Sequence, residues 1–469
     1  MPLNNPITAS EIHAILTTEG VLQDPICARG YQQFQVLNLF LDTLVKKDSK
    51  KGIVSGIAQS WKISADQRTY TFSLSEQAHF HNAEPIFAQD VAFSLRRHLD
   101  ENSKSVVASY LRNVLDKILV IDNRTVEFCL KGAYPAFLEL LSLPGFGIIS
   151  HQSTSNYVIG SGPYEFEPSE TKTWCLRKSR TYPFPTSNID RYYFKIERDV
   201  DLTVDALNSG RANLAMGSPL EVALARNLKP EYKSHPTFSL VTTHIILNHN
   251  NTFLKDFANR KLVADVARFV RDTQNVLTKF DGILDTYLPN GIMPESYYAK
   301  SAATTHLPKL QHKQKIKIVF PYGIFLSSAV EKIVKGYEDA GFEVNHINVK
   351  GKELSTPMQE GDFDLIFIPY QGVIPDPDGY LDILGSLLAK ANLPTFDLLK
   401  NLSEVRFTED KKDRLEKYST YLQDFEKNLH VIPFSQNSIP IVCKNNIKIP
   451  DLEYSYHLNL RDLNMSDEE

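Results

Sequence analysis

Two histidines one residue apart are the first residues in this chain whose spacing could support chemistry. His79 and His81 stand in a polar stretch, residues 79–85, between an alternating segment and a helical one. An imidazole pair can ligate zinc or nickel, but a metal site needs a third or fourth donor, and one sequence does not show such a donor in space. The pattern therefore favours a turn that joins a strand to a helix over a metal site.

An acidic stretch, PDPDGYLD at 375–382, is the second candidate. It lacks the D-x-D-x-D-G spacing and the distal glutamate of a calcium loop, so calcium is not the favoured interpretation. The chain also contains no phosphate-binding P-loop, no G-x-S-x-G and no H-E-x-x-H. These absences argue against an enzyme and for a binding protein that needs no cofactor.

Composition sets the class of protein. The chain has 469 residues, 42% of them hydrophobic and 23% charged, as in soluble globular proteins. This length predicts two or three domains. The net charge of −5 argues against nucleic acid as the main partner.

Cysteines and terminal segments leave alternatives open. Cys27, Cys129, Cys175 and Cys443 are widely spaced, which allows one or two disulfides or four buried thiols. The apolar run at 138–149 is interrupted by polar residues, a proline and glycines, so it does not span a bilayer. The first ten residues show no signal peptide, so either the protein is cytoplasmic or this is the mature chain.

The positions of these residues depend on the elements around them. Residues 69–74 alternate as a half-buried strand does, and apolar residues from 89 to 99 indicate a surface helix. Further on, the pattern predicts a strand at 315–320, a helix at 327–341 and strands at 342–349 and 363–370. That order is a βαβ unit in a largely parallel sheet, in a domain distinct from the strand-rich N-terminal part.

The opening stretch fits a known pattern when it is taken as a whole. Residues 56–97 resemble the signature region of the family 5 extracellular solute-binding proteins, the dipeptide, oligopeptide and nickel binders of ATP-driven importers. The matching residues are Ala58, Ser60-Trp61, Ser64-Ala65-Asp66, Tyr70-Thr71-Phe72, Phe80-His81, Pro85 and Asp90-Val91. Residues 160–166, 246–270 and 361–370 with Asp376-Pro377 are similar to later family blocks, and Gly160 and Gly162 are expected to permit a tight backbone crossing. The resemblance makes His81 a scaffold residue.

The resemblance implies an α/β, two-lobed clamp of the periplasmic-binding-protein type (type II, cluster C) with an extra domain on the first lobe. Lobe I would comprise residues 1–44, 151–245 and 441–469, the extra domain 45–150, and lobe II 246–440. The protein would be a non-catalytic monomer outside the cytoplasm, peripheral to the membrane, that binds a solute between its lobes and passes it to an ABC transporter permease. The alternatives are a cytoplasmic ligand sensor on the same fold and a binder of a non-peptide solute, such as an oligosaccharide or a metal chelate.

Position in the family pattern also implies the ligand contacts. They are Arg29, Tyr31, Gln32 and Phe34 after the first strand, His244 and Asn248 near the hinge strands, and Tyr370 and Gln371 at the mouth of the cleft. Peptide-binding members hold the peptide ammonium with an aspartate three residues after a tryptophan; Tyr370 and Val373 take those places here. A valine offers no counter-charge for a buried ammonium. Asp376 or Asp378 could substitute, with Asp376 the first candidate, so we expect ligand selection that departs from that of the peptide binders.

Overall fold

The computed structural model describes most of the chain. The described residues are 7–17, 23–48, 50–154, 157–167, 174–217, 228–235, 240–278, 281–298, 305–322, 325–350, 353–372, 374–391, 393, 398–437, 439, 441–450 and 459–466, without the side chains of 398–401 and 424. The chain divides into unit 1, Met1–Phe238 with Ile439–Glu469, and unit 2, Ser239–Ser438. The lobe boundaries expected from the sequence are 246 and 440, and the separation of 45–150 as an extra domain stays a prediction.

A seven-stranded sheet organises unit 1. Its order is β12-β19-β11-β1-β10-β9-β8, with β1 parallel to both of its neighbours and the other pairs antiparallel. The strands are β1 (Glu11–Leu16), β8 (Tyr164–Glu167), β9 (Trp174–Lys178), β10 (Arg191–Ile196), β11 (Leu214–Met216), β12 (Tyr232–His235) and β19 (Ile441–Lys444). Strand β19 comes from the end of the chain, so unit 1 is complete only with that segment.

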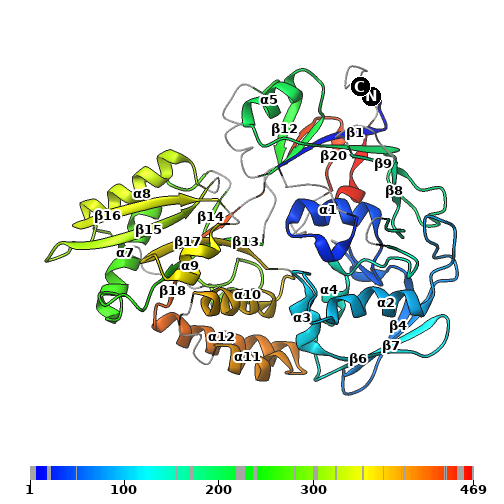
Figure 1. Ribbon diagram of the computed structural model, residues 1–469, viewed down its shortest axis with the longest axis horizontal. Helices are drawn as coiled ribbons and strands as arrows, with labels where there is room; N and C mark the ends of the chain where they lie inside the picture. Colours follow the sequence, from blue (N-terminus) through cyan, green and yellow to red (C-terminus); the bar gives the residue numbers. More distant parts are fainter. Residues whose placement is uncertain are drawn as a thin grey trace. The chain divides into compact units, whose positions relative to one another are not determined.

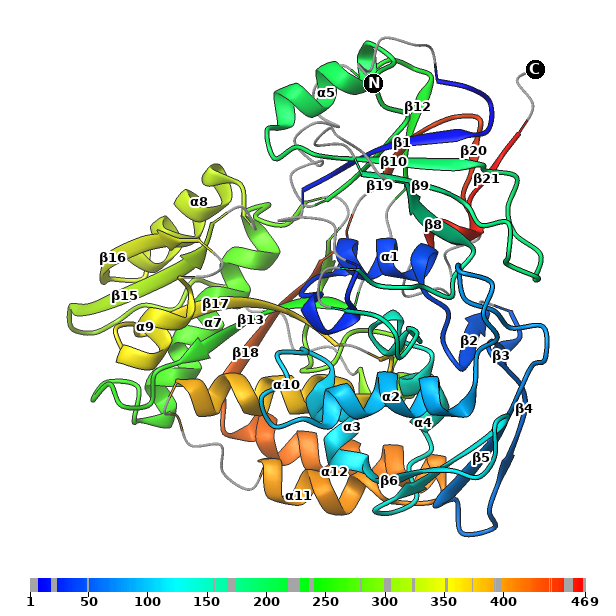
Figure 2. The ribbon, with the colours of Figure 1, turned by 45° about the vertical axis from the view of Figure 1, so that its right-hand side comes forward.

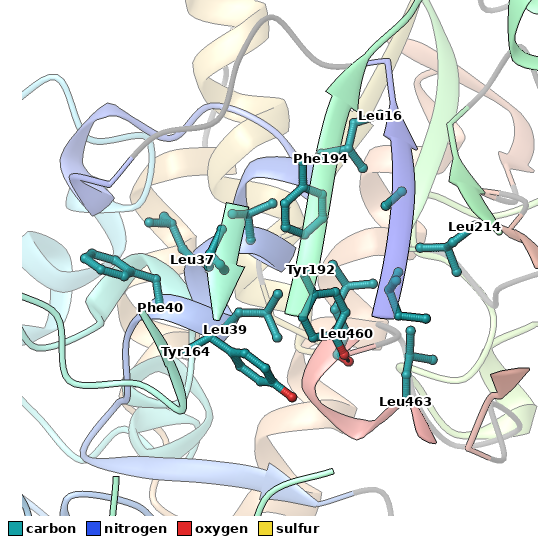
Figure 3. Packing of buried hydrophobic residues seen from close by; sticks show 14 of the residues in the cluster. Leu16, Leu37, Leu39, Phe40, Tyr164, Tyr192, Phe194, Leu214, Leu460 and Leu463 are labelled. Atoms are coloured by element: carbon teal, nitrogen blue, oxygen red, sulfur yellow. Dashed lines mark hydrogen bonds between the residues drawn. The ribbon is translucent and has the colours of Figure 1, made fainter. Parts of the chain in front are cut away.

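The core of unit 1 joins this sheet to α1 (Tyr31–Phe40) and to the C-terminal segment (Figure 3). Leu37 and Phe40 of α1 pack in the same cluster as Tyr192 and Phe194 of β10. The 3₁₀ turn η4 (Leu460–Asp462) belongs to it as well, because Tyr192 donates a hydrogen bond of 2.6 Å to the Leu460 carbonyl. Distant segments of the sequence are thus held in one core.

A second, four-stranded sheet in unit 1 carries the segment that resembled the family signature (Figure 2). Its antiparallel order is β4 (Ala58–Ile63), β5 (Thr69–Leu74), β7 (Thr125–Leu130) and β6 (Leu115–Val120). Strand β5 alternates between half-buried and buried residues, and α2 (Ala88–Leu99) follows it, so the predicted strand and helix are confirmed. The remaining elements of unit 1 are η1 (Pro25–Cys27), β2 (Val45–Asp48), β3 (Gly52–Ser55), α3 (Ala108–Val114), α4 (Phe137–Leu141), η2 (Pro144–Phe146), α5 (Val200–Asn208), β20 (Ile447–Lys448) and β21 (Asn464–Met465).

Unit 2 is built on a six-stranded sheet of order β14-β18-β13-β17-β15-β16 (Figure 1). Its strands are β13 (Val241–Leu247), β14 (Gly282–Ile283), β15 (Gln314–Pro321), β16 (Phe342–Val349), β17 (Leu365–Gln371) and β18 (Val431–Asn437). The βαβ unit is confirmed, since β15 pairs in parallel with β16 and with β17. The expectation of a largely parallel sheet is wrong, because β13 runs antiparallel to both of its neighbours.

Helices of unit 2 pack on both faces of its sheet. They are α7 (Phe257–Thr273), α8 (Ser327–Asp339), α9 (Ser355–Glu360), α10 (Pro377–Lys390), α11 (Leu398–Arg406) and α12 (Lys411–Lys427), with the short turn η3 (Glu295–Tyr297). Helices α7 and α8 share a core cluster with Ile245 and Phe367 of the sheet. On the opposite face, Tyr370 of β17 lies against Tyr380 of α10, with 6.3 Å between ring centroids.

Two sequence questions are answered by this fold. Cys27, Cys129, Cys175 and Cys443 are all free thiols, so the disulfide alternative is wrong. The expectation of four buried thiols is correct only for Cys175 and Cys443, because Cys27 is exposed and Cys129 is half-buried. No helix in the described ranges is long and apolar enough to cross a lipid bilayer.

Candidate functional site

The candidate contacts of unit 1 lie where η1 leads into α1. Arg29 is exposed, and its Nη1 donates hydrogen bonds of 2.9 Å to the carbonyls of Ile26 and Ala28. Tyr31 is the first residue of α1 and is buried, while Phe34 is half-buried and packs against the unit 1 core. This segment combines a surface guanidinium with aromatic rings, which suits an anionic group beside an apolar or cyclic one.

Gln32 of the same segment has its amide engaged within the fold. Its Nε2 donates to the Met216 carbonyl at 2.7 Å and to the Thr17 hydroxyl at 3.0 Å. Its Oε1 accepts from the Thr17 amide at 2.9 Å. Gln32 therefore ties α1 to the ends of β1 and β11, and it would have to give up these bonds to contact a solute.

His244 of unit 2 is fully buried on β13. Its ring stacks with Tyr370, 5.0 Å away, and with Tyr287, 6.1 Å away. Neither ring nitrogen makes a hydrogen bond of normal geometry to a described residue. Burial lowers the pKa of His244 to about 3, so the ring is neutral at physiological pH.

Asn248 follows the same strand and closes a turn. Its Nδ2 donates to the carbonyls of Phe363 at 2.7 Å and Gly361 at 3.1 Å, and its Oδ1 accepts from the Asn250 amide. Like Gln32, Asn248 is engaged within its own unit. Sequence position alone does not reveal such internal partners.

The end of β17 carries the remaining candidates. Tyr370 is buried, and its hydroxyl has no hydrogen-bond partner of normal geometry in the part of the chain that the structure describes. Gln371 is half-buried and pairs with Val241 of β13. Val373 lies outside the described residues.

Asp376 is the N-cap of α10 and is bound by an arginine. Its Oδ1 accepts from the Asp378 amide at 3.0 Å, the usual stabilisation of a helix start. Arg414 of α12, with 1% of its side chain exposed, holds both carboxylate oxygens, at 2.6 and 2.9 Å. A bidentate guanidinium is the strongest common partner of a carboxylate, so Asp376 already has its counter-charge.

Two further acids belong to the same buried network. Arg406 of α11 contacts Asp378 at 2.9 Å and Asp382 at 2.6 Å. Burial raises the pKa of Asp378 to about 6, although the Arg406 charge acts in the opposite direction. The acids of the 375–382 stretch therefore hold α10 to α11 and α12, which is a structural role.

These arginine partners were missed in the sequence. Arg406 and Arg414 lie more than twenty residues beyond the acids and carry no motif. The only hint in the sequence was the number of acidic residues at the start of a helix, because such residues either cap the helix or pair with a cation.

His79 and His81 take the turn geometry that the sequence favoured. His81 hydrogen bonds through Nε2 to the Gly162 carbonyl at 2.9 Å, and its backbone amide donates to the Gly160 carbonyl at 3.0 Å. His79 contacts the Gln77 carbonyl through Nδ1. Among the described residues, no group of three histidine, cysteine or acidic side chains is placed to hold a metal ion.

The two glycines beside His81 explain why this crossing is tight. A Cβ on Gly160 would lie 2.6 Å from the Phe40 carbonyl oxygen, and one on Gly162 would lie 2.5 Å from the Leu39 carbonyl oxygen. Only glycine permits such approaches of backbone to backbone. The predicted close crossing is confirmed.

The model of a family described as "Bacterial extracellular solute-binding proteins, family 5 Middle" matches residues 52–392. The chain belongs to the family 5 bacterial extracellular solute-binding proteins. This family binds solutes and is not catalytic, so the expectation of a binding protein is confirmed.

Relatives of this family 5 protein bind different solutes. It is similar to the nickel-binding periplasmic protein of Escherichia coli (strain K12), with 22% identity over 448 residues that cover 87% of this chain and 85% of the relative. It is also similar to the probable di/tripeptide-binding protein 5 of Pseudomonas aeruginosa (strain UCBPP-PA14), with 25% identity covering 73% of each chain.

A solved structure confirms the fold. The ABC transporter-associated periplasmic binding protein DppA from Helicobacter pylori, in complex with the peptide STSA, superposes with a TM-score of 0.81 over 97% of this chain and 98% of that one. At 18% identity the likeness shows the fold alone. The predicted α/β periplasmic-binding-protein fold is confirmed for this family 5 protein.

Proposed function

We propose that this protein is the solute receptor of an ABC importer, working as a monomer outside the cytoplasm at the membrane periphery. It takes up a peptide-sized solute with residues of both units and delivers it to a permease. The observation that carries the proposal is the family match over residues 52–392. A similar solved structure is named as transporter-associated and contains a peptide. Hinge closure around a bound solute is the usual way in which such two-unit binders signal that they are loaded.

The proposal includes an unusual choice of ligand. A peptide with a free amino terminus brings a charged ammonium, whose burial must be offset by an acid. Val373 stands at the family position of that acid, and Asp376 is already paired with Arg414. We therefore propose that the solute is recognised by Arg29, Tyr31, Phe34 and by the Tyr370 and Gln371 end of β17, without an ammonium clamp.

Native mass spectrometry and calorimetry test this proposal together. Protein purified from cells should retain a solute whose mass differs from that of ordinary di- and tripeptides. Trialanine should bind the parent protein weakly or not at all, and Val373→Asp should gain affinity for trialanine but not for N-acetyl-trialanine. Gln371→Asp is the matched control, since it adds the same charge nearby without restoring the family position.

Micromolar or tighter binding of trialanine by the parent, dependent on its free amino group, would refute this ligand choice. The receptor role itself is tested separately by deleting the gene in the source organism and measuring uptake of the retained solute. Unchanged uptake would contradict the receptor role.

A metal chelate is the second candidate solute. The nickel-binding relative, which matches 87% of this chain, favours it. Nickel has no charged amino terminus to neutralise, so the missing acid is no obstacle. A retained mass with the nickel isotope pattern would select this candidate over a peptide-like molecule.

A further inference from the structure

A cavity of about 380 Å³ lies within unit 1. Its lining comes from four segments of the chain: Lys46 of β2, Tyr164 at the start of β8, Tyr182 and Thr186 of the loop between β9 and β10, and Arg461 and Asp462 of η4. None of these residues belongs to the proposed solute contacts. The volume is enough for a molecule the size of a sugar or an organic acid.

An ion cluster forms the charged part of this cavity. The carboxylate of Asp42, 1% exposed, accepts from Arg461 Nη2 at 2.8 Å on Oδ1 and from Tyr182 at 2.8 Å on Oδ2. Lys46 Nζ lies 2.9 Å from the same Oδ2 and donates to the Tyr182 hydroxyl at 2.8 Å. Two cations therefore share one buried carboxylate.

Donors of this cluster remain without acceptors. Nε of Arg461 is buried and has no hydrogen bond, and Nη1 makes none to the described residues. Burial lowers the pKa of Lys46; Asp42 raises it and the Arg461 charge lowers it again. Arg461 and Lys46 both line the open volume, and Arg461 has donors that no described residue uses, so the cavity suits a ligand with an acceptor group.

Asp462 is the one acid in the lining. It is exposed, and no described lysine or arginine lies within ion-pair distance of its carboxylate. The lining therefore offers both cations and a carboxylate to a ligand. An acceptor group of a ligand suits Arg461 and Lys46, and a hydroxyl or ammonium donor suits Asp462.

We propose that this cavity is a second binding site, for a small hydroxylated or amino-substituted carboxylate or phosphate. Its oxyanion is bound by Arg461 and Lys46, and its donor group by Asp462. Because η4 is a segment of the C-terminal part of unit 1, occupancy fixes that segment against the β9–β10 loop.

Isothermal titration calorimetry at constant ionic strength tests this site with citrate, glutamate and glycerol 3-phosphate as probes and chloride as the blank. At least one probe should bind with one-to-one stoichiometry. Comparison of citrate and glutamate with glycerol 3-phosphate shows whether the site prefers a carboxylate or a phosphate. Binding should also slow hydrogen exchange in a peptide that covers residues 459–466.

Four variants locate the binding. Arg461→Gln should weaken it by about tenfold or more, the size expected for a lost charge-assisted contact. Thr186→Trp, at the exposed rim, should block the cavity without touching the ion cluster. Asp462→Asn should weaken binding of glutamate, because its ammonium group would lose the charged partner that the proposal assigns to it. Lys51→Gln, an exposed lysine outside the lining, should leave binding unchanged.

Absence of saturable binding by all three probes would overturn the proposal. So would binding that Thr186→Trp and Arg461→Gln both leave unchanged, since the probe would then occupy another site, such as the solute site. Thr186→Trp leaves every ion pair in place and is expected to fold. It therefore tests the site even if the Arg461 variant does not fold.

Discussion

Replacing Arg414 with methionine should release the start of α10. Arg414 is almost fully buried, holds both oxygens of Asp376, and donates from Nε to the Arg406 carbonyl at 3.1 Å. Methionine keeps the unbranched apolar stem of the side chain but removes the guanidinium and all these donors. The carboxylate of Asp376 then stays in a largely buried place without its counter-charge.

The magnitude follows from the arrangement of charges. Asp376, Asp378 and Asp382 contribute three negative charges, and Arg406 and Arg414 two positive ones. Removing one partner of a buried ion pair typically costs about 3–5 kcal/mol. If the network opens locally, that cost corresponds to hydrogen exchange roughly 10²- to 10⁴-fold faster in α10.

Hydrogen exchange with mass spectrometry is the suitable assay, because both tryptophans, Trp61 and Trp174, belong to unit 1 and do not report on α10. The matched control is Lys417→Met in the same helix, whose ion pair with Asp413 has both side chains 50% exposed. That control should cost less than about 1 kcal/mol. Adding Asp376→Asn to the Arg414 variant should recover part of the loss.

Equal exchange rates in the Arg414 and Lys417 variants would refute the reasoning. The reasoning is also refuted if the stability loss of the double variant equals the sum of the losses in Asp376→Asn and Arg414→Met, because residues that interact do not behave additively. Either result would mean that Asp376 is not held by Arg414, and it would become available as an ammonium partner.

Two further predictions concern the scaffold. His244 stays neutral in the folded protein but is protonated below its ordinary pKa of 6.5 when the chain is unfolded, so the folded state loses stability as the pH is lowered from 7 to 5. His244→Phe should reduce this loss of stability by about 2 kcal/mol, measured by hydrogen exchange of β13 at pH 7 and pH 5. The same substitution at the exposed His346 should leave the loss as it is, and a loss that His244→Phe does not change would contradict the reasoning. Gly162→Ala should destabilise unit 1 by about 1–3 kcal/mol, because the added Cβ would overlap backbone atoms of residues 39–41. Thermal unfolding followed by tryptophan fluorescence measures the change, and Gly30→Ala, which has open space around the added Cβ, is the control. Equal melting temperatures of the two variants would contradict the argument for a tight backbone crossing.

Local sequence patterns predicted those strands and helices whose form depends only on the alternation of buried and exposed residues. The alternation at 69–74 and the order strand, helix, strand at 315–349 depend on which face of each element is buried, and that is written in neighbouring residues. The direction of β13 is not written there. It depends on pairing with β17 and β18, more than a hundred residues further along the chain, so the sheet turned out mixed instead of largely parallel.

The candidate site was predictable only as a set of positions. Gln32 and Asn248 have the residue type of a ligand contact, yet their amides serve Met216 and Phe363 within the fold. Such partners are brought together by folding and leave no local pattern. The Asp376–Arg414 pair is of the same kind, since an acid that is free in the sequence is paired in space.

The matching signature residues explain why the fold was easier to recognise than the ligand. His81 and Gly162 fasten the crossing into β8 through a hydrogen bond and a close backbone approach, and Asp90 holds both the Phe87 amide and His151. Each of these contacts lies inside unit 1, and each is satisfied without a solute. A change at any of them costs folding energy whatever the solute is, whereas the aspartate-to-valine replacement that we propose at position 373 would exclude only the solutes that carry an ammonium. The specificity of such a receptor therefore has to be sought in the positions that depart from the family pattern.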